Sequence, residues 1–484
     1  MKHMVKCVVC LVTFAAGVSF TAFGGTTINV GSGETCTTIT EAMTYVGTLG
    51  DDAFPVEIIV KPGTYAETGF KLNKAITIRG ATSNPADVEI VDNAAGSRAF
   101  TLSDANAAVR DLTVSGTGLH TTGGCGGHIN MTAGTVENCI LTDGCAGTKV
   151  SSGSTAASNG RGGNVWMSGG RLVRCQVLKG MANDYNGANT PSYGAGIYAS
   201  GGVVESCLVR GNSAVDESSK SKPTNVLGGG LYADGPVTVA NCTFVDNVAG
   251  VPATSAGGIQ LGKDTAKAAK IVNCIFYGNG GTAVREFGGD NLDRFSHCAS
   301  SVTNTSCDTW QVMTERDFAG YQQQDFHLLQ GSALMDAGTQ DSDWYPPEAS
   351  EYDLDGLDRV SGKAIDIGCY EVDQSGISCS GYPSVYGAFE GSNVTFTAQG
   401  VGGSGNYVFE WDFGDETSSG PAGAVCTHAY QTSGLFTMRV RVSDDSGATW
   451  SDWSIVPTKI VVTPKEMFVN ASAASPAFPY RTPE

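Results

Sequence analysis

The sequence predicts an all-β protein in which a parallel β-helix is followed by a small β-sandwich. Three observations support this prediction: a glycine-rich phrase with a cysteine recurs five times, two later segments alternate apolar and other residues, and the composition favours strands and tight turns over helices. Only 16% of the 484 residues are charged, and 65 are glycine.

Residues 1–24 are predicted to be a secretory signal peptide. Lys2 and Lys6 precede an apolar run, and small residues stand at the cleavage positions before Gly25. The run is too short to favour a membrane span, and no later segment is expected to cross a bilayer. Without Lys2 and Lys6 the formal charge changes from −19 to −21 (27 basic and 48 acidic residues). This acidity argues against nucleic acid and anionic membranes as partners.

Five segments align on a cysteine at spacings of 36, 32, 35 and 32 residues, which is typical of a stacked repeat. Positions −3 and +2 around each cysteine are apolar, and position −1 is Asn, Arg or Ser. Alternate residues of a straight strand face opposite sides, so positions −3, 0 and +2 all face inward only if a corner separates −3 from 0. The aligned cysteines are Cys139, Cys175, Cys207, Cys242 and Cys274.

We therefore expect coils of two or three short strands, stacked in parallel, with the cysteines as an inward row of small hydrophobic side chains. A helical solenoid would need a 3.6-residue period, and a propeller would need a hairpin in each repeat. A metal-binding thiol ladder is disfavoured by the Val, Leu and Phe neighbours. The segment with Ile39, Ala42, Met43 and Val46 has helical spacing, which predicts a small helix closing the N-terminal end of the stack.

Cysteine parity leaves the disulfide pattern open. Removal of Cys7 and Cys10 with the signal peptide leaves thirteen of the fifteen cysteines, so at least one thiol is free or pairs between chains. The candidate pairs are Cys298–Cys307 and Cys369–Cys379.

Two stretches of the chain resemble known secreted proteins. The phrases "EIIVKPGTYAE" and "GGGLYADGPVTVANCTFVDNVA" resemble coils of pectin-lyase-like right-handed β-helix proteins, and this resemblance covers residues 25–325. Residues 326–375, with "FHLLQGSALMDAGTQ" and "DIGCYE", resemble the choice-of-anchor Q segment that follows such β-helices in many bacterial secreted proteins. The resemblance implies a right-handed parallel β-helix with this segment at its C-terminal end.

Residues 382–464 resemble a PKD domain, a small immunoglobulin-like β-sandwich, through "YVFEWDFGDETSSG" and "CTHAYQTSGLFTMRVRVSDDSG". Independently, both phrases place an apolar residue at every second position, which predicts strands with one buried face. The resemblance implies a spacer or weak binding unit of an extracellular protein. Residues 465–484 are predicted to be a linker or a truncated tail.

Three acidic residues in "DLDGLDR" are spaced like the ligands of a calcium loop, although the distal Glu of an EF-hand is missing. In the alternative interpretation, Gly356 makes a turn and Arg359 pairs with Asp366 or Glu371. Calcium is thus a candidate ligand and not a required cofactor. The candidate metal ligands are Asp353, Asp355 and Asp358.

Trp166, Tyr198 and Tyr232 occupy equivalent positions in the glycine-rich phrases. Because each follows an inward aliphatic residue, strand parity predicts that all three point outward. An outward row of rings predicts a sugar-stacking strip. We expect that replacing all three with Ala weakens glycan binding without unfolding the chain.

Two classes of function are consistent with the sequence. The resemblance to β-helix enzymes implies either a lyase with Ca²⁺-binding acids and an Arg or Lys base, or a hydrolase with several aspartates. The sequence lacks Asn-Thr-Asp, Gly-His-Gly and Arg-Ile-Lys, "GGHIN" at His128 echoes one of them only in part, and no catalytic residue is assigned. The prediction therefore favours a secreted or cell-surface binding or adhesive scaffold for extracellular polysaccharide. The alternative is a polysaccharide lyase or glycoside hydrolase.

Overall fold

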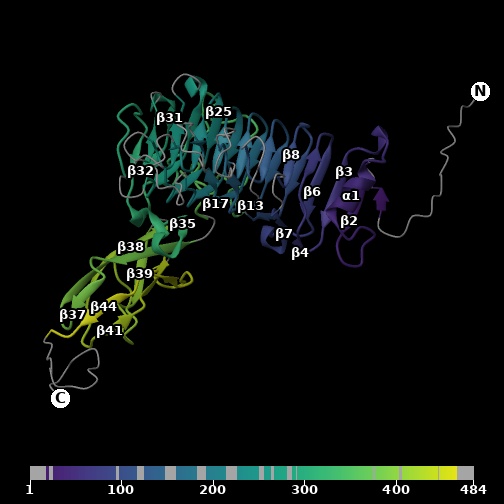
Figure 1. The fold of residues 1–484 in the computed structure, drawn as a ribbon. Coiled ribbons are helices and arrows are strands. Elements are labelled where there is room, and N and C mark those ends of the chain that lie inside the picture. The colour runs from purple at the N-terminus through teal and green to yellow at the C-terminus, as the bar shows by residue number, and fades with distance from the viewer. Residues whose placement is uncertain are drawn as a thin grey trace, which may run out of the picture. The chain divides into compact units, whose positions relative to one another are not determined.

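The computed structural model of the chain is nearly all β, with three sheets of many short strands followed by smaller sheets (Figure 1). One coil contributes one strand to each large sheet, as β11 (Ile129–Met131), β12 (Thr135–Glu137) and β13 (Ile140–Thr142) do. The structure describes residues 18–20, 25–93, 98–116, 125–147, 160–182, 192–213, 226–249, 255–262, 266–280, 286–289, 292–373, 377–402, 406–444 and 446–465.

Successive coils pair in parallel and in register. The strands β11, β12 and β13 pair with β15, β16 and β17 of the next coil, and residue partners stay aligned from coil to coil. Such stacking is a parallel β-helix, as predicted, because a propeller would show antiparallel blades.

The strands of the three large sheets are short. The eleven-stranded sheet consists of β1 (Val18–Phe20), β2 (Thr26–Val30), β3 (Val56–Val60), β6 (Ile76–Gly80), β9 (Ala108–Arg110), β12, β16 (Arg171–Val173), β21 (Gly202–Glu205), β25 (Val237–Ala240), β28 (Lys270–Val272) and β31 (Phe295–Ser296). The ten-stranded sheet consists of β4 (Gly63–Tyr65), β7 (Val88–Val91), β10 (Thr113–Ser115), β13, β17 (Gln176–Leu178), β22 (Leu208–Arg210), β26 (Thr243–Val245), β29 (Ile275–Tyr277), β32 (Ala299–Ser300) and β33 (Gln311–Val312). The eight-stranded sheet consists of β5 (Phe70–Leu72), β8 (Phe100–Leu102), β11, β15 (Val165–Met167), β20 (Ile197–Ala199), β24 (Leu231–Ala233), β27 (Ile259–Leu261) and β30 (Phe287–Gly288).

The described part of the chain also contains three two-stranded sheets and several 3-10 helices. The two-stranded sheets pair β14 (Cys145–Ala146) with β18 (Met181–Ala182), β19 (Ser192–Tyr193) with β23 (Val226–Leu227), and β34 (Phe318–Gly320) with β35 (Asp325–Leu328). The 3-10 helices are η1 (Asp51–Ala53), η2 (Pro85–Asp87), η3 (Ala266–Ala268), η4 (Leu292–Arg294), η5 (Glu315–Asp317) and η6 (Tyr321–Gln323).

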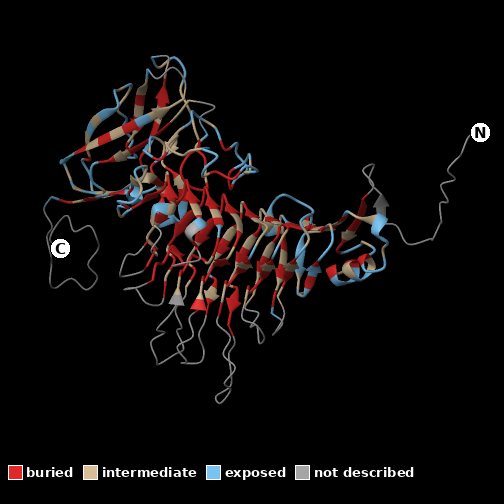
Figure 2. Ribbon diagram, turned by 90° about the horizontal axis from the view of Figure 1, so that it is seen from above, coloured by how far each residue is buried: buried red, intermediate tan, exposed pale blue. Residues whose placement is uncertain are grey.

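The aligned cysteines form an inward row, as predicted. All five are at most 1% exposed, and Figure 2 shows buried residues following the strands of the coils. The backbone N–H of Cys175 donates to the sulfur of Cys207 at 3.4 Å, and the Cys207 thiol donates to the Glu205 carbonyl at 3.1 Å. The thiols therefore serve as small core side chains with local hydrogen bonds.

The structure corrects the two candidate disulfides. Cys298 is a sixth member of the inward row, because the backbone N–H of Cys274 donates to its sulfur at 3.4 Å. Cys379 lies in the core of the sandwich, and the backbone of Cys369 donates to Thr243. None of the thirteen cysteines in the described part of the chain forms a disulfide. Sequence spacing misplaced Cys298 because its repeat lacks the glycine-rich phrase.

A corner precedes each cysteine, as predicted, and the residue at this corner is left-handed. The residues at position −1 have a positive φ, which L-residues other than Asn and Asp adopt rarely. They are Asn138 (48°), Arg174 (49°), Ser206 (51°), Asn241 (52°) and Asn273 (53°). The corner turns the chain so that the cysteine and the apolar residue three positions earlier both face inward.

The predicted helix, α1 (Ile39–Val46), lies beside β2 and β3 at the N-terminal end of the coils (Figure 1). Thr38 and Glu41 form a capping box, in which each side chain accepts a hydrogen bond from the other residue's backbone N–H. Ile39, Ala42 and Val46 are buried as expected, whereas Met43 is half-buried.

The C-terminal sandwich has three small sheets. These are β36 (Ser378–Pro383), β38 (Asn393–Val401) and β40 (Val425–Ala429); β37 (Gly387–Phe389), β44 (Ile460–Thr463) and β41 (Gly434–Phe436); and β39 (Val408–Asp412), β42 (Arg439–Ser443) and β43 (Ser454–Ile455). Trp411, Phe413, Val440 and Val442 are buried in its core, which confirms the predicted alternation.

The predicted signal peptide and tail lie mostly outside the described residues. Within residues 1–24 only β1 is described, and it pairs antiparallel with β2. Residues 466–484 lie outside the described part of the chain.

Candidate functional site

Trp166, Tyr198 and Tyr232 lie side by side on the outer face of the eight-stranded sheet and are called the aromatic column below. Strand register pairs Trp166 with Tyr198 and Tyr198 with Tyr232, while Ile197 and Ala199 are fully buried on the inner side. Adjacent rings are nearly parallel, at 7° and 11°, with centroids 6.3 and 6.0 Å apart. The structure thus brings the three predicted residues together.

A second row of side chains reaches this column across a glycine bend. Arg161 and Tyr193 are parallel-bridge partners four residues before the strands of Trp166 and Tyr198. Gly162 and Gly194 follow them with φ of +68° and +63°, and a Cβ there would lie 1.9 and 2.0 Å from a backbone oxygen. Only glycine fits such a position. Past the bend, the Tyr193 ring lies 4.6 Å from that of Tyr232, centroid to centroid.

Arg161 and Asp234 supply charge at the column. The Arg161 guanidinium carbon lies 5.1 Å from the Tyr198 ring centroid, and Nη1 donates to the Tyr198 hydroxyl at 3.4 Å. That hydroxyl in turn donates to the Asp234 carboxylate. Burial raises the pKa of Tyr198, with a further rise from Asp234, and burial raises the pKa of Tyr232 to about 12. Both hydroxyls are therefore protonated at neutral pH, and that of Tyr198 is the donor to Asp234.

The rings differ in exposure. Tyr198 and Tyr232 are only 3% and 8% exposed, whereas Trp166, Tyr193 and Arg161 are half-buried. The indole Nε1 of Trp166 has no hydrogen-bond partner among the described residues. Truncating a buried aromatic residue to Ala costs about 3–5 kcal/mol. The burial therefore argues against the expectation that all three rings can be removed without unfolding the chain.

Sequence reasoning missed a buried amide ladder inside the coils. Asn212, Asn247 and Asn279 are fully buried, and each side-chain amide donates to the next acceptor along the stack, ending at the Glu286 carboxylate. A detectable signal exists, because each of these three asparagines stands five residues after an aligned cysteine.

His128 also lies inside the coils. Its Nε2 is 2.9 Å from the Thr142 carbonyl and its Nδ1 is 3.4 Å from the Asp92 carboxylate, and both side chains are fully buried. The phrase "GGHIN" therefore places an interior histidine away from the aromatic column.

The three aspartates of the predicted calcium loop point to different partners. Asp353 is buried and its carboxylate accepts the N–H groups of Asp355 and Glu371 at 3.0 and 2.8 Å. The exposed Asp355 carboxylate lies 2.8 Å from Nε2 of His327, and Asp358 is exposed. In the described parts of the chain, no group of three or more His, Cys, Asp or Glu side chains is arranged to hold a metal ion. The calcium site stays a sequence prediction.

The alternative interpretation of this phrase matches the geometry. Arg359 and Glu371 form an ion pair at 3.0 Å with side chains at most 2% exposed, and Arg359 also donates to the carbonyls of Asp366 and Gly368. Gly356 has a φ of +88°, as a turn requires. Burial raises the pKa of Glu371 to about 9 and that of Asp366 to about 6. The contacts of Arg359 with Glu371 and with the two carbonyl groups hold the turns of the segment together.

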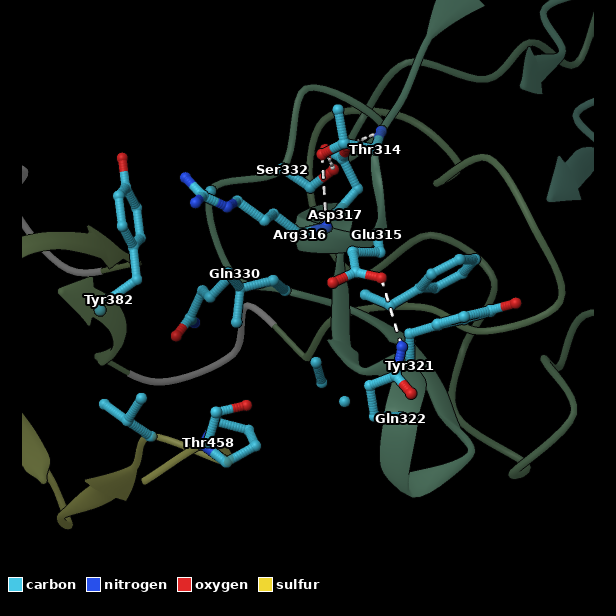
Figure 3. Close-up of a pocket in the computed structure, with 18 of the residues that line it drawn as sticks. Thr314, Glu315, Arg316, Asp317, Tyr321, Gln322, Gln330, Ser332, Tyr382 and Thr458 are labelled. Atoms are coloured by element: carbon cyan, nitrogen blue, oxygen red, sulfur yellow. Dashed lines mark hydrogen bonds between the residues drawn. The ribbon is translucent and has the colours of Figure 1, made fainter. Parts of the chain in front are cut away.

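A pocket of about 380 Å³ is lined by residues 314–323 and 329–333 and by side chains of the sandwich. Figure 3 shows the Arg316 side chain extending towards Tyr382, while the Glu315 carboxylate turns to Gln322, whose amide donates to it at 3.4 Å. Sequence reasoning did not single out these residues, because they come from separate segments of the chain.

Comparison with known proteins identifies the sandwich. The model of the PKD domain matches residues 383–456, close to the predicted bounds of 382–464. No curated protein matches the chain. Within the described residues, no helix has both the length and the apolar character needed to cross a membrane. PKD domains are typical of extracellular proteins, whereas the pectin-lyase-like and choice-of-anchor Q resemblances stay predictions.

Proposed function

We propose that the protein is a secreted or surface-displayed scaffold that binds an extracellular polysaccharide on the outer face of its β-helix. The observation that carries the proposal is the aromatic column, with Tyr193 and Arg161 folded against it. Aromatic rings combined with a few convergent polar groups are typical of small-ligand sites. The PKD domain supports the extracellular setting.

The exposure of each residue of the site determines its proposed role in binding. Trp166 and Tyr193 are half-buried and offer ring surface to the apolar face of a sugar. The guanidinium of Arg161 is a donor, and the carboxylate of Asp234 is an acceptor for sugar hydroxyls. Tyr198 and Tyr232 support this surface from below rather than stack on the ligand.

Retention of the full chain on a panel of immobilised neutral and acidic polysaccharides tests the proposal. We expect Trp166→Ala to weaken binding about three- to tenfold, since an aromatic contact contributes about 0.5–1.5 kcal/mol. Tyr352→Ala is the matched control, because Tyr352 is an exposed aromatic residue outside the site. Equal retention of wild type and Trp166→Ala would overturn the proposal.

Incubation of the full chain with the same polysaccharides distinguishes a binding scaffold from the enzymatic alternative. Unsaturated products that absorb in the ultraviolet would identify a lyase, and new reducing ends without them would identify a hydrolase. Retention of intact polysaccharide supports the binding scaffold.

A further inference from the structure

We propose that the pocket of Figure 3 binds a carboxylate group of an acidic oligosaccharide, with Arg316 as the residue that pairs with the carboxylate. This site shares no residue with the aromatic column. The proposal therefore goes beyond the proposed function, and different variants test the two.

Arg316 lies in a turn whose backbone is held by hydrogen bonds. The Asp317 carboxylate accepts the backbone N–H of Thr314 at 2.8 Å and the hydroxyl of Ser332 at 2.8 Å, and the Thr314 hydroxyl accepts the N–H of Arg316 at 3.3 Å. The backbone that carries Arg316 is thus held by a capping box and by a contact to the neighbouring segment.

The guanidinium itself is available to a ligand. Arg316 is exposed, and its side chain makes no hydrogen bond or ion pair within the described residues. Its two acidic neighbours do not neutralise it, because Asp317 is engaged in the turn and Glu315 faces Gln322. A guanidinium presents its donors in a planar fork that matches a carboxylate with two parallel hydrogen bonds.

The rest of the lining suits a sugar. Tyr382 and Tyr386 are half-buried in the pocket wall and offer ring surface together with a hydroxyl group. Burial raises the pKa of Tyr386, and both Arg316 and Glu315 act on it electrostatically, which places these charges close to the hydroxyl. Glu315 supplies an acceptor for sugar hydroxyls. A volume of about 380 Å³ lies at the lower end of the usual range for small-ligand sites, which suits a short stretch of a glycan.

Calorimetric titration of the full chain with two trisaccharides of equal size, one built of uronic acid residues and one neutral, tests this inference. We expect the acidic trisaccharide to bind wild type at least tenfold more tightly than the neutral one. Arg316→Ala should lose this preference, because it removes the charged donor that pairs with the carboxylate. Arg316→Lys should retain part of it, since the charge remains and the planar fork is lost.

Lys363→Ala is the matched control, because it removes one exposed positive charge outside the pocket. Equal effects of Arg316→Ala and Lys363→Ala, or no preference for the acidic trisaccharide in wild type, would overturn the inference. A loss of binding in Trp166→Ala with no change in Arg316→Ala would also overturn it while supporting the aromatic column. The reverse result would support the pocket and count against the column.

Discussion

The side-chain amide of Asn212 donates to Oδ1 of Asn247, one coil further along, at 2.8 Å, and the backbone N–H of Asn212 donates to the same oxygen at 3.1 Å. Asn247 repeats both bonds towards Asn279, at 2.9 and 3.0 Å. Each amide is thus a donor to one coil and an acceptor from another. This arrangement satisfies polar groups that the coil interior would otherwise leave unpaired.

Replacement of Asn247 by Leu should destabilise the β-helix. Leu has a similar volume but leaves the backbone N–H of Asn212 and the Val209 carbonyl without the partners that Asn247 supplies. We expect a loss of at least about 2 kcal/mol, measured as a lower urea midpoint. Asn106→Leu makes the same change at an exposed position and should leave the midpoint nearly unchanged. Equal midpoints for the two variants would refute a stabilising role of the ladder.

Ser206 should be a site of stabilisation. It holds a φ of +51°, and its buried hydroxyl has no hydrogen-bond partner among the described residues. A left-handed conformation costs an L-residue about 1–2 kcal/mol, so Ser206→Gly should raise the free energy of unfolding by about 1 kcal/mol. Ser206→Ala removes the hydroxyl but keeps the backbone strain, and it should gain less. Thermal unfolding of the two variants is the measurement. A higher midpoint for Ser206→Ala than for Ser206→Gly would contradict the claim that the backbone at Ser206 is strained.

The inward cysteines should resist alkylation in the folded protein. Burial raises the pKa of Cys139, Cys175 and Cys274 well above the ordinary value, and the thiolate is the reactive form. Cys125, Cys307 and Cys426 are half-buried and should react first with iodoacetamide at pH 8, as mass spectrometry of peptides would show. All thiols should react in urea. Labelling of the inward row as fast as Cys125 without denaturant would show that the row is accessible.

His327 should make stability depend on pH above neutrality. Hydrogen bonds to Asp355 (2.8 Å) and Asp325 (2.5 Å) raise the pKa of His327 to about 9, and the ring packs on Tyr370. Because the folded pKa lies above the unfolded value of about 6.5, the stabilisation is complete below pH 6.5 and is lost as the pH rises towards 9.

The measurement is the thermal midpoint of wild type and of His327→Gln between pH 6 and 10. The difference between the two curves should be largest at pH 6 and should shrink through this window. Taking the difference removes the contributions of Glu371 and Asp366, which both proteins share. A difference that does not change with pH would exclude the proposed ion pairs.

Part of the candidate site could be predicted from local sequence. The recurrence of an aromatic residue after an inward aliphatic residue placed Trp166, Tyr198 and Tyr232 on the outer face of one sheet. Arg161 and Tyr193 could not be predicted, because they reach the column only through the bend that glycine allows between them and the strands. Burial of Tyr198 and Tyr232 likewise depends on neighbours from other coils.

The sequence by itself determined the parallel coils, the corners before the cysteines, the inward cysteines and the sandwich. These features depend on residue spacing and strand parity, which act over a few residues and repeat. Only the tertiary structure decided that Cys298 joins the inward row, that Asp353 binds backbone N–H groups, and that Arg316 faces a pocket. Cys298 and Arg316 are placed by residues far apart in the chain, and the Asp353 carboxylate accepts the N–H of Glu371 eighteen residues away; such contacts leave no local pattern in the sequence.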